Sequence, residues 1–144
     1  DMNARGGFSF LELIVAVAIL AILAAIVGVQ VVPHIGKSKV TAAKAQISML
    51  EEALDLYRID ADIYPTQEQG LESLCRKPTR PPVPRRYTEE GYLKKKQVPL
   101  DPWGRDYVYM IPGPNGERYF ILSYGADGEP GGDGENADIS SSDS

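Results

Sequence analysis

The chain has almost none of the residues on which disulfide, thiol and imidazole chemistry depend. Its 144 residues include one cysteine, Cys75, and one histidine, His34. A single cysteine cannot form an internal disulfide, so stability must come from packing, a metal or neighbouring copies. Apolar and basic residues surround Cys75, which favours a buried structural thiol over a nucleophile. His34 ends an apolar run, far along the chain from candidate partners, so a Cys/His or Ser/His catalytic pair is not expected.

Excess positive charge is also absent, because the formal net charge is −5. Proteins that bind nucleic acids need clustered cations along the phosphate backbone, so nucleic acid is not an expected partner. The charges are nevertheless segregated: residues 76–96 contain eight basic and two acidic residues, whereas residues 127–144 contain no base. This polarity suits packing between like subunits, and it is equally typical of a solvated loop and a solvated tail.

One long apolar segment occupies the N-terminal part of the chain. Residues 8–32 are 25 nearly uninterrupted apolar positions, and a helix of that length spans about 37 Å, enough to cross a bilayer core of about 30 Å. A cleaved secretory signal carries small residues after its apolar core, whereas Gly6 and Gly7 precede this one. We therefore expect any cleavage to leave the helix attached to the protein.

Glu12 interrupts this apolar segment. A carboxylate deep in a bilayer costs about 2.5–3.5 kcal/mol on insertion scales, so such a residue usually has a partner. Two interpretations follow from the residues. Glu12 reaches the lipid headgroups, or an N-terminal amine of an adjacent subunit provides its partner.

The residues Gly7-Phe8-Ser9-Phe10-Leu11-Glu12 resemble the cleavage motif of type IV pilins and pseudopilins. The resemblance implies that a prepilin peptidase cuts between Gly7 and Phe8 and methylates the Phe8 amine. It also implies that Glu12 pairs with the Phe8 amine of a neighbour during assembly. The expected organisation is a leader at residues 1–7, a hydrophobic transmembrane and filament-core helix at 8–36, and a periplasmic globular domain at 37–144. Val31-Val32-Pro33 comes about four residues later than is usual in such proteins, and Pro33 is expected to kink or loosen the helix.

The remainder of the sequence predicts a helix followed by a small sheet. From Lys37 to about Asp60, apolar residues recur at spacings of three and four, which indicates an amphipathic helix. Pro65 should stop it, and Thr66 with Gln69 forms a capping box for a short second helix. Strands are expected at 107–111 and 118–123, joined by a turn with Asn115-Gly116, and a third strand near 137–140.

Several head motifs narrow the resemblance. They are similar, in the same order, to those of the major pseudopilins of type II secretion systems: Tyr64-Pro65-Thr66, Gln69-Gly70-Leu71, Gly91-Tyr92-Leu93, Asp101-Pro102-Trp103-Gly104 and Ser123-Tyr124-Gly125-Ala126-Asp127-Gly128. The resemblance implies an α+β pilin fold, with a long N-terminal helix packed on a small antiparallel sheet that a C-terminal calcium-binding loop closes.

The function implied by this resemblance is structural. The subunit would polymerise into the periplasmic pseudopilus that helps to drive folded proteins across the outer membrane. Its partners would be further copies of itself, minor pseudopilins, a prepilin peptidase, and an inner-membrane assembly platform with its ATPase. Before assembly it would lie in the bacterial inner membrane as a single-pass protein with its head in the periplasm, and it would not be an enzyme.

Residues 127–138 contain five acidic residues and four glycines but no base. Oxygen donors without a nearby histidine or cysteine favour calcium over zinc, although a merely solvated loop has the same composition. The resemblance implies a calcium site in this loop, with Asp127 as its first ligand, Asp138 as its last and the Tyr124 carbonyl as a backbone donor. Asp133, Glu135 or Asn136 would complete it.

Two other functions fit parts of the sequence. A surface type IV pilus or another pilin-like filament shares the N-terminal motif. A membrane-tethered, calcium-dependent hydrolase is a remote second alternative, disfavoured because no acid/base pair converges.

Overall fold

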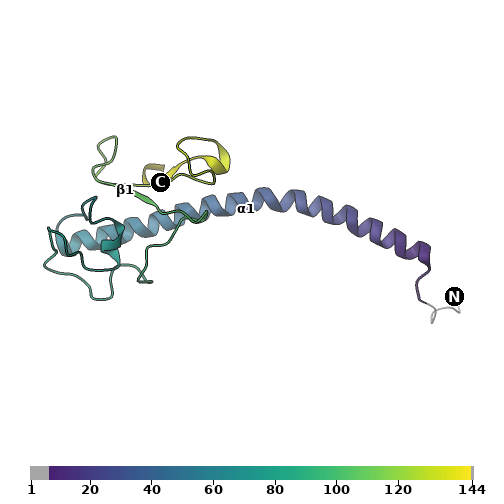
Figure 1. Cartoon of the computed structure of the whole chain (residues 1–144), viewed down its shortest axis with the longest axis horizontal. Helices are drawn as coiled ribbons and strands as arrows, with labels where there is room; N and C mark the ends of the chain where they lie inside the picture. Colours follow the sequence, from purple (N-terminus) through teal and green to yellow (C-terminus); the bar gives the residue numbers. More distant parts are fainter. Residues whose placement is uncertain (1–6, 144) are drawn as a thin grey trace. The chain divides into compact units, whose positions relative to one another are not determined.

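The computed structural model describes residues 7–143, and for residues 26–35 and 143 it describes the backbone alone. The chain forms two compact units, Asp1–Lys37 and Ser38–Ser144. One α-helix, α1 (Phe10–Ala61), contributes to both units and is 52 residues long (Figure 1). The helix continues without interruption through Pro33. The side chain of Pro33 lies outside the described residues, and the loosening predicted there stays a prediction.

The second half of α1 is amphipathic, as its spacing predicts. One face of this half is buried in the core of the second unit, through Ala43, Ile47, Leu50, Leu54 and Tyr57. Val40 is partly buried against the same core. Burying such side chains is worth about 1.5–3 kcal/mol each, so packing rather than helix propensity holds this half of α1 to the head.

The helix ends four residues before Pro65. Asp62 has φ 68°, a left-handed conformation that an aspartate tolerates, and its N–H donates to the Arg58 carbonyl at 2.7 Å. The left-handed residue terminates α1, so Pro65 is not the stop that the sequence predicts. Pro65 is instead fully buried.

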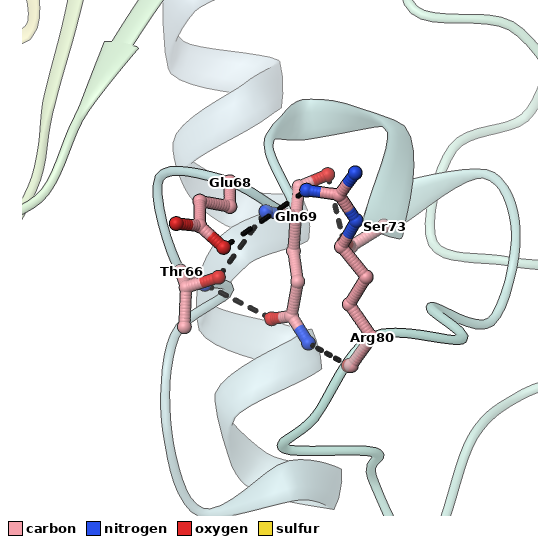
Figure 2. Close-up of polar contacts among 5 residues, drawn as sticks. All are labelled: Thr66, Glu68, Gln69, Ser73 and Arg80. Carbon is pink, nitrogen blue, oxygen red and sulfur yellow. Dashed lines mark hydrogen bonds and ion pairs between the residues drawn. The ribbon is translucent and has the colours of Figure 1, made fainter.

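The predicted capping box forms, but no α-helix follows it directly. The Thr66 N–H donates to Gln69 Oε1 at 3.0 Å and the Gln69 N–H donates to Thr66 Oγ1 at 3.1 Å (Figure 2). Gly70, with φ 66°, then reverses the backbone, and a single 3₁₀ turn, η1 (Leu71–Leu74), replaces the expected helix. The capping box therefore closes a turn rather than starting a helix.

Three short strands form an antiparallel sheet in the order β1-β2-β3. They are β1 (Val108–Met110), β2 (Phe120–Ser123) and β3 (Ile139–Ser140). Met110 pairs with Phe120, and Ser123 pairs with Ile139. The hairpin and the third strand are confirmed, but the first two strands are shorter than predicted. Pro112 lacks the N–H that would extend the ladder beyond Ile111.

Tyrosine hydroxyls join the sheet to α1 and to the segment after it. The Tyr107 hydroxyl donates to Gln46 Oε1, and the Tyr119 hydroxyl donates to Glu51 Oε2 at 3.4 Å. The buried Tyr109 hydroxyl donates to the Pro65 carbonyl at 2.8 Å. A long helix packed on a small antiparallel sheet is the α+β class that the sequence predicts.

Candidate functional site

The beginning of α1 has a built helix cap. Ser9 precedes the helix, and its Oγ accepts a hydrogen bond from the Glu12 N–H at 3.2 Å, while its carbonyl accepts one from the Leu13 N–H at 3.1 Å. Ser9 is therefore the N-cap, which the interpretation of the sequence missed. The signal was present, because Ser-x-x-Glu before an apolar run is a capping-box pattern.

Glu12 itself is exposed, in the first turn of α1. Within the described part of the chain, its carboxylate takes part in no hydrogen bond or ion pair. Its neighbours on the same segment are exposed apolar side chains, among them Phe8 at 87% and Phe10 at 78%. The structure thus leaves the Glu12 carboxylate available to a group outside the chain.

Residues 1–6 of the predicted leader lie outside the described residues. Gly7 and Phe8 are described, and they precede the helix without regular structure. Across the described residues, we find no helix whose length and apolar character suffice to cross a membrane.

The acidic loop, residues 124–138, is tied together by its backbone. The Ala126 N–H donates to the Glu135 carbonyl at 2.9 Å, which joins the two arms. Gly125 has φ 77°, and a β-carbon there would lie 2.7 Å from the Ala137 carbonyl oxygen. The close approach of the two arms therefore requires glycine at position 125.

Asp127 and Asp138 each accept one hydrogen bond within this loop. Asp127 Oδ1 accepts from the Glu129 N–H, and Asp138 Oδ2 accepts from the Gly131 N–H, both at 3.1 Å. Asp138 Oδ1 is buried without a hydrogen-bond partner. A buried carboxylate oxygen left unpaired is costly, so this atom is placed for a cation or another donor.

The other predicted ligands are less clearly placed. Asp133 precedes the 3₁₀ turn η2 (Gly134–Asn136) and Asn136 is its last residue; both are exposed, as is Glu135. The Asn136 N–H donates to the Asp133 carbonyl at 3.0 Å. Among the described residues, no three His, Cys, Asp or Glu side chains are grouped so that they could hold a metal ion. The structure therefore brings the arms of the loop together but not the complete predicted ligand set.

Arg105 contacts the first turn of the acidic loop. Its Nη1 donates to the carbonyls of Gly125 and Ala126 at 3.1 and 3.2 Å. The sequence interpretation missed this residue, because twenty positions separate Arg105 from Gly125 and no local pattern links them.

Glu51, on the face of α1 near the sheet, resembles Asp138 in having one buried carboxylate oxygen without a hydrogen-bond partner. Its Oε1 is buried without a partner, while Oε2 accepts the Tyr119 hydroxyl. Burial raises the pKa of the Glu51 carboxyl above its ordinary value of 4.5, the Tyr119 hydroxyl opposes that shift, and nearby Asp55 adds to it. Of the described side chains, only those of Glu51 and Asp138 have a buried oxygen or nitrogen without a hydrogen-bond partner.

Two family models match the chain and together account for nearly all of it. The model described as "Prokaryotic N-terminal methylation motif" matches residues 2–28. The model described as "Type II secretion system (T2SS), protein G" matches residues 30–142.

The chain belongs to the type II secretion system protein G family. Relatives named type II secretion system core protein G from Pseudomonas aeruginosa and Vibrio cholerae are each 46% identical to it. The first alignment covers 94% of this chain and 93% of the relative, and the second covers 96% and 92%. A crystal structure of the major pseudopilin from enterohaemorrhagic Escherichia coli is similar, with a TM-score of 0.62 and 40% identity, over 73% of this chain and 87% of that one.

Membership of the protein G family confirms the predicted pilin-like fold and identifies the chain as a pseudopilin subunit of the type II secretion system. The family consists of structural subunits that form a filament with other pseudopilins. Together with the N-terminal methylation motif, it implies a membrane-anchored periplasmic filament.

Proposed function

We propose that this protein G family member polymerises from the inner membrane into the periplasmic pseudopilus and acts there without catalysing any reaction. The observation that carries the proposal is the order of two matched regions in one chain, a methylation motif at residues 2–28 and a protein G region at residues 30–142. The first region supplies the assembly end and the second supplies the head.

The assembly end works through two groups in this proposal. A prepilin peptidase cuts between Gly7 and Phe8 and methylates the new Phe8 amine, and Glu12 of one copy then pairs with the Phe8 amine of the next. The exposed, unpartnered carboxylate of Glu12 supports this role. Before assembly, residues 8–32 hold the protein in the inner membrane as a single span, with the head in the periplasm. Their run of 25 nearly uninterrupted apolar positions supports this arrangement.

The work of assembly comes from outside the chain. We assign it to an inner-membrane platform and its ATPase, with minor pseudopilins as further partners of the filament. A non-catalytic role agrees with the chemistry of the head, where the one cysteine is buried and burial raises the pKa of its thiol.

The Glu12→Ala variant tests the assembly role. In cells that contain the remaining secretion components, the variant should insert into the inner membrane as the wild type does but form no filaments, because the Phe8 amine has lost its partner. Membrane fractionation measures insertion, and electron microscopy of the overexpressed full chain measures filaments.

Glu90→Ala is the matched control, since it removes an exposed carboxylate from the head and should leave filaments intact. Filaments of normal number and length in Glu12→Ala would refute the proposed pairing. Loss of insertion would instead assign Glu12 to the membrane step.

We also propose that the acidic loop binds calcium. The unpaired, buried Asp138 Oδ1 and the all-oxygen donor set support a hard divalent cation. Asp127, Asp133, Asn136, Asp138 and the Tyr124 carbonyl would hold it, with Glu135 as the substitute for Asp133 or Asn136. A bound calcium ion would neutralise the mutual repulsion of the carboxylates and hold the glycine-rich arms together.

A further inference from the structure

Arg105 lies against the first turn of the acidic loop, residues 125–128, and binds it through the main chain. Nη1 donates to the Gly125 and Ala126 carbonyls at 3.1 and 3.2 Å. The guanidinium is so close to Gly128 that a β-carbon there would lie 2.5 Å from Nε. Gly128 has φ 70°, so glycine at this position allows both the turn and the approach of the arginine.

A closed network of hydrogen bonds fixes the position of Arg105. Its own N–H donates to Asp101 Oδ1 at 2.8 Å, and Asp101 is only 4% exposed. The Ser123 hydroxyl donates to Asp101 Oδ2 at 2.8 Å. The Gly125 N–H donates back to Ser123 Oγ at 3.3 Å. The network thus connects Arg105, Asp101 and the end of β2 to the same turn that the guanidinium contacts.

The guanidinium of Arg105 forms no ion pair with a carboxylate of the described residues. Within the described part of the chain, the one ion pair joins Arg80 Nη1 and Glu68 Oε2 at 3.9 Å. Arg105 therefore brings a positive charge to the edge of a segment with five carboxylates and no base, while it leaves those carboxylates free for a cation.

We propose that Arg105 is a positioning residue that holds the first turn of the acidic loop in its folded conformation when no cation is bound. The guanidinium and the cation then stabilise the same loop from different sides. This second statement rests on the calcium site proposed above. The role of Arg105 without a cation does not depend on the calcium site, because its hydrogen bonds go to the Gly125 and Ala126 carbonyls and to the Asp101 side chain.

Hydrogen exchange of the full chain in detergent tests the proposal with the variants Arg105→Gln and Arg105→Lys. In chelator, Arg105→Gln should speed exchange at the Ala126 N–H, which reports closure onto Glu135, by about three- to tenfold, the range expected for two weakly shielded hydrogen bonds to a charged group. Arg105→Lys keeps the charge but lacks the planar fork, so it should show a smaller acceleration. Arg86→Gln is the control, because that exposed arginine makes no polar contact within the described residues.

Millimolar calcium should reduce the difference between Arg105→Gln and the wild type. Unchanged exchange in chelator for Arg105→Gln would overturn the proposal, as would an equal acceleration for Arg86→Gln. An equal effect in both solutions would overturn the statement that arginine and cation stabilise the same loop. If calcium fails to protect even the wild type, the metal site is refuted, and accelerated exchange in chelator still supports Arg105 alone.

Discussion

At the scale of single residues, two carboxylates of the described part of the chain differ from the others, because each has a buried oxygen without a hydrogen-bond partner. Asp138 lies in the acidic loop, where a cation is the proposed partner. Glu51 lies on α1 beside Tyr119, where burial raises the pKa of the carboxyl. A raised carboxyl pKa in the folded state means that ionisation opposes folding.

Glu51→Gln should therefore raise the stability of the head at neutral pH. In the wild type, the contribution of Glu51 is most favourable below its ordinary pKa of 4.5 and is lost as the pH rises through the higher folded-state pKa. The amide cannot ionise and still accepts the Tyr119 hydroxyl. Melting temperatures should be measured between pH 4 and 8. The variant should melt higher than the wild type by an amount on the order of 3 °C at neutral pH, and both proteins should melt at the same temperature near pH 4.

Glu52→Gln provides the comparison, because Glu52 is the next residue on α1 and is exposed. It should shift the melting temperature little at any pH. A constant advantage of Glu51→Gln at all pH values would show that lost ionisation is not its cause.

Sequence reasoning succeeds at those residues whose role is local. The reciprocal bonds of Thr66 and Gln69 were predicted, because a capping box spans only four positions. Arg105 and the unpaired oxygen of Glu51 were not, because each depends on segments that meet only after folding. The predicted ligands Asp127 and Asp138 depend on such a meeting too, and they stay predictions.

At the scale of elements, Gln69 links the capping turn to the proline-rich loop, residues 78–84. In addition to the capping bonds, its Nε2 donates to the Arg80 carbonyl at 2.7 Å (Figure 2). The same Nε2 donates to the Pro82 carbonyl at 3.0 Å. One side chain thus supplies the donors for two carbonyls of a loop in which Pro81 and Pro82 have no N–H of their own.

Gln69→Ala should loosen this loop. The Thr66 N–H loses its acceptor, at a cost of about 1 kcal/mol, and the two carbonyls of the loop lose their donor. Limited proteolysis should then cut near residues 77–86 faster than in the wild type. Gln97→Ala is the control at an exposed glutamine without a polar contact within the described residues. Equal cleavage of all three proteins would contradict this role.

The long helix and the hairpin were predictable, but the residues that end the long helix and shorten the second one were not. The amphipathic spacing in α1 and the Asn-Gly turn indicated a helix and a hairpin, since both are periodic or short-range signals. The end of α1 at Ala61 lies one residue from the expected end near Asp60, but the left-handed residue Asp62 sets it instead of Pro65. Gly70 reduces the predicted second helix to a 3₁₀ turn. Both changes follow from single backbone conformations that composition does not reveal.

At the scale of the whole molecule, the calcium proposal predicts a large effect of the cation on unfolding. At a hundredfold excess over Kd, binding stabilises the folded state by about 2.7 kcal/mol, which corresponds to a rise in melting temperature on the order of 5–10 °C. Asp138→Asn should abolish this rise in the full chain in detergent, because the amide cannot supply the second anionic oxygen.

Asp106→Asn is the matched control and should keep the calcium response, since Asp106 is exposed and lies outside the acidic loop. Identical melting temperatures of the wild type in calcium and in chelator would refute the metal site. A response retained in Asp138→Asn would exclude Asp138 as a ligand.

Membership of the protein G family was predictable from sequence because its motifs run through the whole chain in a fixed order. The relatives at 46% identity likewise align with nearly the whole chain, so the family membership does not depend on any one residue. Filament geometry was not predictable from the sequence, because it depends on contacts between copies, which no pattern within one chain contains.

Within the described residues, the one ion pair joins the exposed side chains of Arg80 and Glu68 at 3.9 Å. Such a pair contributes little to folding, so monovalent salt has almost no ion pair to screen inside the head. Apart from Arg80, the charges of residues 76–96 and 127–138 take part in no ion pair within the described residues, so salt screens the repulsion within each group and any attraction between these groups on different copies. Ionic strength is therefore a variable that should change the association of copies while it removes few stabilising ion pairs from the fold of each copy.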